Sequence, residues 1–456
     1  MLAGRGKPQS HPQALYTMEK MERREFVRRR RRLMEVMGAD SIAILPAAPV
    51  RPRNRDVEFP FRPDSDFYYL TGFPEPEAVA VLVPGRAQGE YVLFCRERDP
   101  EKELWDGVRA GLEGACETYQ ADDAFPIGDI DDIIPGLMEN RARVFYAMGY
   151  NADFDQQVLG WVNQIRRRSR AGVNAPAEFV ALDHLLHELR LYKSKSELHM
   201  MRKAMAISGR AHRRAMAVCR PGLREFEIEA ELIYEFMRAG SRAPAYPAIV
   251  AAGANSCILH YTENSGLLRA GDLLLIDAGA EYEYYAADIT RTFPISGRFT
   301  PAQRAIYELV LAAQREAIAQ VRPGNHWQDP HEATVRVLTE GLLALGLLKG
   351  RLTHLIKKEH YKKFFMHRTG HWLGMDVHDV GDYKVAGEWR LLEPGMVTTI
   401  EPGLYIRGGD RSVPKKWWNI GIRIEDDVLV TENGPEVLTG DVPKDVEEIE
   451  ALVGSG

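Results

Sequence analysis

The strongest constraint on this chain is a set of side chains of metal-binding types that follow strand-like or turn-like segments. Residues 273–276 form a short, fully apolar run, which is typical of a buried strand, and the run ends at a carboxylate. Such a charge is costly in a protein core unless something is bound to it. The complete set is Asp277, Asp288, His371, Glu401 and Glu425.

Four carboxylates that converge need positive charge between them, because like charges resist being ionised together. Two divalent cations held about 3.5–4 Å apart would supply that charge. Such a pair also makes hydroxide from water at neutral pH and polarises a carbonyl group. The sequence therefore predicts a hydrolase with two metal ions, although Asp277 and Asp288 alone could equally be turn residues.

The spacing of these residues predicts how they meet. Gly279 opens a turn, so Asp277 and Asp288 can face each other across a hairpin-like pair. Residues 420–425 alternate in the period-two pattern of a half-buried strand, which places Arg423 on the same face as Glu425. Arg423 can then orient carboxylates through hydrogen bonds. Residues 396–400 predict another strand, which ends at Glu401 before a Pro-Gly pair.

The 456 residues are enough for more than one domain. We expect a disordered tail at 1–14, a mixed α/β domain at 15–173 and a catalytic domain at 174–456, which together give an α/β (α+β) fold class. The first domain should hold a basic helix near 18–37 and strands at 41–46, 78–83, 91–95 and 143–148. Gly, Asn and Pro break the periodicity at 170–177, where we predict the boundary.

Three helices are predicted in the catalytic domain, at 194–218, 225–239 and 301–321. Ser194 with Glu197 forms a capping-box pattern at the start of the first helix. Pro301 follows Thr300 at the start of the third, where proline is well tolerated.

Composition sets mild bounds on partners and location. The formal net charge of −6 gives no reason to expect nucleic acid. The arginine run at 28–32 is interpreted as a solvated helix face, because glutamates surround it. Four cysteines without a C-x-x-C pair fit a reducing compartment. Without a membrane-spanning run or an apolar signal segment in the first 14 residues, the sequence predicts a cytoplasmic protein without membrane contact.

Six segments resemble, in order, the signatures of the aminopeptidase P (Xaa-Pro aminopeptidase) family of pita-bread metallopeptidases. They are HYTEN at 260–264, LLLIDAG at 273–279, DITRTF at 288–293, HWLGMDVHD at 371–379, EPGLY at 401–405 and GIRIEDD at 421–427. Residues 59–79 resemble the family's N-terminal domain, and residues 187–198 resemble the entry to its catalytic domain. The resemblance thus covers nearly the whole chain, and no ligand position departs from the family pattern.

The resemblance implies a pita-bread catalytic domain of two similar halves and a role for each site residue. Asp277 would bind one metal ion, Asp288 and Glu425 would bridge both, and His371 and Glu401 would bind the other. The remaining site residues would be the histidines His260, His367 and His378 and the supporting residues Tyr405 and Arg423. Manganese is the family's usual ion and suits a carboxylate-rich site.

The activity implied is release of the N-terminal residue from peptides with proline at the second position. His260 or His378 would stabilise the oxyanion that develops on the scissile carbonyl, and Glu401 would transfer protons. Homo-oligomers, dimers or tetramers, are expected, since Trp105 matches a position where the family's N-terminal domain reaches a neighbouring active site.

Three alternatives on the same fold remain open at this point. A prolidase would cleave only Xaa-Pro dipeptides, and the N-terminal segment argues against it. Creatinase-like chemistry on this fold works without metal, and retention of all five ligands argues against it. A non-enzymatic binding module is the third alternative, and such modules lack the complete ligand set that this chain retains. A helical zinc pair at His367 and His371 is rejected, because the intervening residues lack the glutamate of the H-E-x-x-H motif and include Gly370.

Overall fold

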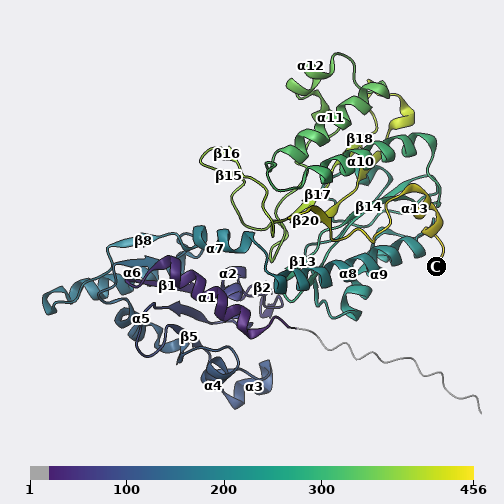
Figure 1. Cartoon of the computed structure of the whole chain (residues 1–456). Helices are drawn as coiled ribbons and strands as arrows, with labels where there is room; N and C mark the ends of the chain where they lie inside the picture. Colours follow the sequence, from purple (N-terminus) through teal and green to yellow (C-terminus); the bar gives the residue numbers. More distant parts are fainter. Residues whose placement is uncertain (1–19) are drawn as a thin grey trace, which may run out of the picture.

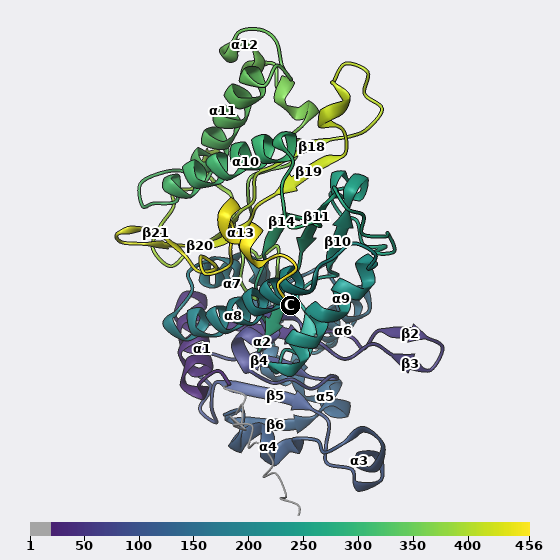
Figure 2. The ribbon, with the colours of Figure 1, turned by 90° about the vertical axis from the view of Figure 1, so that its right-hand side faces the viewer.

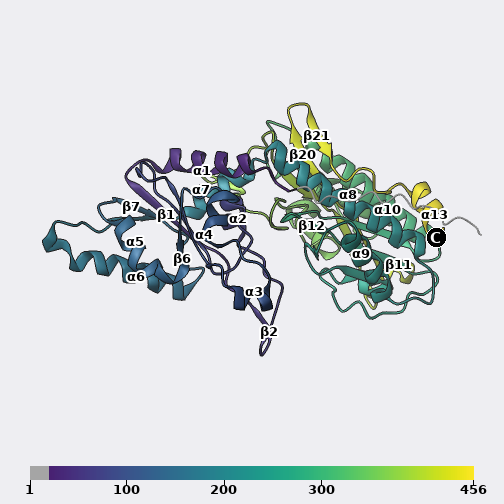
Figure 3. The ribbon, with the colours of Figure 1, turned by 90° about the horizontal axis from the view of Figure 1, so that it is seen from below.

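The structure is a computed structural model that describes residues 20–456. An N-terminal α/β unit and a larger C-terminal unit lie side by side (Figure 1; Figure 3). The tail predicted at 1–14 lies outside the described residues. Among the residues described, no helix combines the length and the hydropathy required to cross a membrane.

The N-terminal unit is built on a six-stranded mixed sheet in the order β6-β5-β4-β1-β7-β8. Its strands are β1 (Ser41–Pro46), β4 (Val79–Leu82), β5 (Tyr91–Cys95), β6 (Asp123–Pro126), β7 (Arg143–Phe145) and β8 (Glu178–Val180). A small hairpin, β2 (Pro52–Asn54) and β3 (Val57–Glu58), projects from the unit. The strands predicted at 41–46, 78–83 and 91–95 are confirmed, and the one at 143–148 is shorter than predicted.

Alternate residues of β1 face opposite layers of helices, as the period of a strand requires. Ile42 and Ile44 pack in one core with α5 (Ile130–Met138) and α6 (Ala152–Arg167). Ala43 and Leu45 belong to the other core, with α1 (Arg23–Met37) and α2 (Ser65–Thr71). The short helices α3 (Pro100–Asp106) and α4 (Gly111–Glu117) follow β5, and α7 (Leu182–Leu191) leads into the second unit.

The predicted domain boundary at 173/174 precedes a strand of the first unit. β8 pairs in parallel with β7, so Glu178–Val180 completes the N-terminal sheet. We propose that the N-terminal unit extends to Val180.

The interpretation of the arginine run at 28–32 as a solvated helix face is wrong for two of its residues. Arg29 and Arg30 are buried on α1, and Arg29 Nη1 donates to the Tyr69 carbonyl at 2.9 Å. Arg29 Nη2 also donates to the Tyr285 hydroxyl at 3.1 Å and lies 3.5 Å from Glu197 Oε1. Tyr285 and Glu197 belong to the C-terminal unit, so Arg29 is a buried link between the two units.

The C-terminal unit has two halves of similar build, as the pita-bread resemblance implies. The first half pairs α8 (Lys195–Val218) and α9 (Glu225–Arg238) with the antiparallel sheet of β10 (Ile249–Ala252), β11 (Leu273–Asp277) and β14 (Thr290–Pro294). The second pairs α10 (Pro301–Gln320) and α11 (Asp329–Ala344) with the antiparallel sheet of β17 (Val397–Ile400), β20 (Asp426–Thr431) and β21 (Gly434–Val437). In Figure 2, α10 and α11 lie above these strands and α8 and α9 below them.

Smaller elements complete this unit. They are the strands β9 (Ala243–Pro244), β12 (Ala280–Tyr282) and β13 (Tyr285–Ala286), the hairpin β15 (Lys384–Val385) with β16 (Glu388–Trp389), the pair β18 (Gly403–Ile406) with β19 (Ile420–Arg423), and the helices α12 (Leu352–Lys357) and α13 (Val446–Leu452).

The three predicted long helices are confirmed within a residue or so as α8, α9 and α10. The capping box predicted for α8 is present, since Ser194 and Glu197 exchange hydrogen bonds between side chain and backbone. Pro301 occupies the first turn of α10 behind Thr300, which caps the helix.

Two predicted strand features are only partly right. β11 and β14 do pair, with Asp277 opposite Thr290, but β12 and β13 lie between them in the chain, and Asp288 precedes β14. β19 ends at Arg423, so Glu425 lies between β19 and β20 rather than within a strand. Its backbone N–H nevertheless donates to the Thr290 carbonyl at 3.0 Å, which draws it against β14.

Candidate metal centre

The structure brings the five metal-type side chains together in one cleft of about 1370 Å³. Ligand atoms of Asp288, His371 and Glu425 all lie within 4.8 Å of one another, a spacing that can hold a metal ion. Asp277 and Glu401 line the same cleft, and His371 Nε2 lies 3.7 Å from Glu401 Oε1. The strands explain this convergence, because β11 ends at Asp277 and β17 ends just before Glu401.

Two side chains hold Asp277 and Asp288 in place. The Tyr246 hydroxyl lies 2.6 Å from Asp277 Oδ1 and 2.5 Å from Asp288 Oδ1. Arg423 Nη2 donates to Asp277 Oδ2 at 2.7 Å, as the strand pattern predicted for a carboxylate-orienting arginine. Burial and the two aspartates hold the pKa of Tyr246 well above its usual value, so its hydroxyl stays protonated as a donor.

Glu425 and Asp288 are supported from the other side of the cleft. The Thr290 hydroxyl donates to Glu425 Oε2 at 2.7 Å. The Asp288 backbone N–H donates to Asp427 Oδ2 at 3.1 Å, while Asp427 Oδ1 is buried without a hydrogen-bond partner. Burial and the charge of Asp288 hold the pKa of Asp427 well above its usual value.

The charges of the site show a surplus of carboxylates. Burial, together with Asp288, raises the pKa of Glu401 to about 7 against the pull of His371 and Arg423. Burial and the charges of Asp288 and Glu401 likewise hold the pKa of Glu425 well above its usual value. The His371 pKa rises to about 9, because its contacts with Asp288 and Glu401 outweigh its burial. The site thus holds more carboxylates than its positive charges neutralise, and carboxylate oxygens are the ligands that hard divalent cations prefer.

The other predicted site residues surround this centre at different depths. His260 and His378 are exposed in the cleft, and the His378 ring meets the His371 ring edge-on at 4.4 Å between centroids. His367 Nδ1 lies 3.9 Å from Glu401 Oε2. Tyr405 is buried behind it, with its hydroxyl 2.9 Å from His367 Nε2 and 3.0 Å from Arg423 Nη1.

His367 and His371 lie in an irregular segment and not on a helix, which agrees with the rejection of a helical zinc pair. Sequence reasoning missed three residues of the site, Tyr246, Thr290 and Asp427. Thr290 and Asp427 stand two residues beyond Asp288 and Glu425, so a wider search around each ligand would have found them. The segment around Tyr246 carries no comparable signal.

A two-unit chain with a carboxylate-and-imidazole cleft between the halves of its second unit has the architecture of the pita-bread metallopeptidases. Comparison with known families agrees, and the chain belongs to metallopeptidase family M24, whose model matches residues 199–432. Residues 26–146 match the model of the aminopeptidase P N-terminal domain.

Individual relatives extend this likeness over nearly the whole chain. The Xaa-Pro aminopeptidase of Escherichia coli is 46% identical over 437 residues, which cover 96% of this chain and 99% of the relative. The structure of Pseudomonas aeruginosa aminopeptidase PepP is 64% identical, with a TM-score of 0.95 over 95% of this chain and 98% of that one. A zinc-substituted E. coli aminopeptidase P in complex with product has a TM-score of 0.92 and 46% identity, over 95% of this chain and 98% of that one.

Proposed function

We propose that this chain is a metal-dependent aminopeptidase that releases the N-terminal residue from peptides with proline at the second position. The observation that carries the proposal is the convergence of four carboxylates and His371 in a cleft large enough for a peptide. Two relatives that this chain matches over 99% and 98% of their own length are Xaa-Pro aminopeptidases.

We assign two divalent cations to the centre, with Asp277 on one ion and His371 and Glu401 on the other. Asp288 and Glu425 would be shared by the two ions, and their ligand atoms lie within 4.8 Å of one another and of a ligand atom of His371. The carboxylate surplus favours manganese, a hard ion, over zinc, which more often draws histidine and cysteine.

When bound, such ions lower the pKa of water and polarise the scissile carbonyl. The chain's own residues then complete the chemistry. We assign proton transfer to Glu401, whose carboxylate lines the cleft at the centre. His260 or His378, which both line the cleft, donates a hydrogen bond to the oxyanion.

His367 is assigned to substrate contact and not to proton transfer. Arg423 donates to the Tyr405 hydroxyl, which leaves the hydroxyl proton for His367 Nε2. His367 Nδ1 lies 2.6 Å from the Arg368 carbonyl, which can only accept, so this nitrogen carries the ring proton. Burial and the charge of Arg423 lower the pKa of His367 to about 3, so the ring is neutral and offers the substrate its face.

We assign the free N-terminal amine of the substrate to a position near Asp277, which would make the enzyme an exopeptidase. The proline nitrogen has no N–H and its ring fixes the backbone, so the site must accept a tertiary amide.

The alternatives are less well supported. Prolidase activity would confine cleavage to dipeptides, and the aminopeptidase P N-terminal domain argues against it. Retention of the five metal-type side chains argues against metal-free creatinase chemistry and against a binding module.

We also propose that the protein is a cytoplasmic homo-oligomer. Trp105, on α3 of the N-terminal unit, is 89% exposed, and Leu104 and Val108 beside it are 86% and 80% exposed. Large apolar side chains exposed together are typical of an interaction surface.

Mass spectrometry of the products from four peptides tests the proposal. They are an Xaa-Pro-Yaa tripeptide, its Ala-for-Pro analogue, its acetylated form and an Xaa-Pro dipeptide. We expect release of Xaa from the tripeptide, little cleavage of the alanine analogue and strongly reduced cleavage after acetylation. Cleavage confined to the dipeptide would move the assignment to prolidase, and equal cleavage of the alanine analogue would remove proline specificity.

A further inference from the structure

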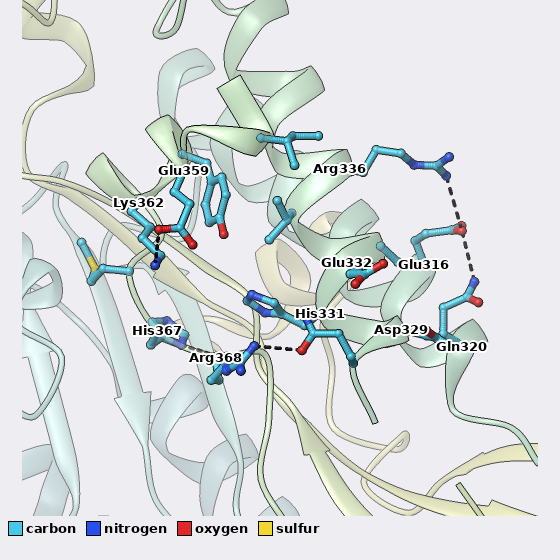
Figure 4. A pocket seen from close by; sticks show the side chains of 16 residues that line it. Glu316, Gln320, Asp329, His331, Glu332, Arg336, Glu359, Lys362, His367 and Arg368 are labelled. Carbon is cyan, nitrogen blue, oxygen red and sulfur yellow. Dashed lines mark hydrogen bonds and ion pairs between the residues drawn. The ribbon is translucent and has the colours of Figure 1, made fainter. Parts of the chain in front are cut away.

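A second cavity, of about 940 Å³, lies beside the metal centre, between α11 and the segment that carries His367. Its size falls in the range of ligand-binding clefts, roughly 300–1,000 Å³. Figure 4 shows side chains from α10, from α11 and from the segment at 359–368 around this space, with His331 between Arg368 and Glu332. Of the residues that line it, only His367 has a role proposed at the metal centre.

The two cavities share part of their walls. His367 and Arg368 line both of them. His367 is also the substrate-facing neighbour of Glu401 at the metal centre. A peptide whose proline lies against His367 therefore has the second cavity beside its next residues.

The shared wall is held firmly. The Thr369 carbonyl accepts from the Glu401 backbone N–H at 2.7 Å, and the Thr369 hydroxyl lies 2.9 Å from His331 Nδ1. On the other side, His367 is tied to the Tyr405 hydroxyl. Arg368 thus lies between two residues that are each held by hydrogen bonds.

Most of the hydrogen-bond donors of the Arg368 side chain have no partner among the described residues. Its guanidinium carries five N–H groups, and the structure gives it one hydrogen bond, from Nη1 to Gln328 Oε1 at 2.9 Å. It lies 5.1 Å from the centroid of the Trp389 ring, and no carboxylate in residues 20–456 comes within ion-pair distance of it. The other basic residues of the cavity differ, because Lys362 pairs with Glu359 at 2.7 Å and Arg336 lies 4.0 Å from Glu316.

We propose that this cavity is an exosite for the part of the peptide that follows the proline, and that Arg368 donates hydrogen bonds to that segment at the entrance. The proposal rests on the proposed function and adds to it a preference for long substrates. Carbonyl oxygens of the peptide backbone are the acceptors that any sequence offers, and an acidic side chain next to Arg368 strengthens the contact.

Kinetics on two amidated peptides test the exosite. One is a tripeptide amide and the other is several residues longer with the same Xaa-Pro-Yaa start, so neither has a terminal carboxylate. The measurement is the ratio of kcat/KM for the long peptide to that for the short one. We expect a ratio of about ten or more, the size of one hydrogen bond to a charged group.

Three variants show where the preference arises. Ala333→Trp places a large ring in the cavity from α11, away from the cleft, and should bring the ratio close to one. Arg368→Ala should lower the ratio and abolish any preference for an acidic residue after Yaa. Arg351→Ala removes an exposed arginine before α12 that lines neither cavity, and should leave the ratio unchanged.

A second readout does not depend on turnover. A product peptide that begins with proline and carries a photoreactive side chain near its C-terminus is crosslinked to the metal-loaded protein. We expect adducts within 328–336 in the parent and not in Ala333→Trp. Adducts confined to other segments, or equal adducts in Ala333→Trp, would overturn the proposal.

The outcomes distinguish failure of the proposed aminopeptidase function from failure of the exosite proposal. A parent that leaves the tripeptide intact contradicts the proposed function. A parent that cleaves both peptides with equal kcat/KM contradicts the exosite alone, and so does a ratio that Arg368→Ala leaves unchanged. The arginine variant keeps the test decisive if the tryptophan variant does not fold.

Discussion

Replacing Arg29 with methionine should weaken the attachment of the N-terminal unit to the catalytic unit. The side chains of Arg29 and Glu197 are each 2% exposed, and they face each other at 3.5 Å across the junction. Methionine keeps most of the volume and removes the charge. Glu197 would then stay buried with its backbone contact at Ser194 and the Tyr285 hydroxyl, but without its cation.

The magnitude follows from burial. Removing one partner of a buried ion pair costs about 3–5 kcal/mol, because the other charge is left without compensation. Arg29 also donates to the Tyr69 carbonyl and to Tyr285, and these bonds are lost with it. We therefore expect a loss of stability at the upper end of that range.

The assay is equilibrium denaturation in urea, followed by circular dichroism, with the first transition fitted separately because a two-unit chain need not unfold in one step. Arg28→Met is the matched control. Arg28 and Arg29 both pair with Glu25, but the Arg28 side chain is 51% exposed, so its removal should cost less than about 1 kcal/mol. Equal effects of the two substitutions would refute the argument from burial.

Three further predictions concern the site and its surroundings. Asp288→Ala and Glu425→Ala should each lose at least one metal ion and nearly all turnover while the fold survives; retention of full metal content would refute the bridging assignment. His367→Ala should lower kcat with metal content unchanged, since its ring nitrogens are used by Tyr405 and a backbone carbonyl; loss of metal would contradict this. Burial lowers the pKa of His187, but the hydrogen bond and charge of Asp66 outweigh this and raise the pKa above 6.5 in the folded protein. The contact between protonated His187 and Asp66 therefore stabilises the fold fully below about pH 6.5, and this contribution is lost as the pH rises through the pKa of His187 in the folded protein. Melting of the metal-loaded His187→Gln variant between about pH 6 and 8 should therefore show a flatter pH dependence than the parent, and an unchanged slope would refute the assignment.

Local patterns predicted much of the fold. The apolar run that ends at Asp277, the β-branched run before Glu401 and the caps of α8 and α10 depend on neighbours in the sequence, and each formed as expected. The resemblance to a family then grouped the site residues, and all the metal-type side chains line one cleft.

Contacts between distant segments could not be predicted in this way. A run of arginines resembles a solvated face, and only the packing of α1 on α8 and β13 shows that Arg29 is buried. Tyr246 is more than thirty residues from Asp277 in the chain, yet its hydroxyl lies between two of the site carboxylates. The strand β8 returns to its sheet after a long helix, so the composition break before it does not mark the end of the unit.

The central claim is that the buried carboxylates and His371 hold two divalent cations. It is tested most directly by counting metal ions per chain after chelation, reconstitution with manganese and desalting, with activity on Xaa-Pro-Yaa measured on the same samples. We predict that the chelated protein is inactive and that activity returns as the content rises to two ions per chain. Full activity in thoroughly metal-depleted protein, or reconstitution without uptake of manganese or any other divalent ion, would contradict the account.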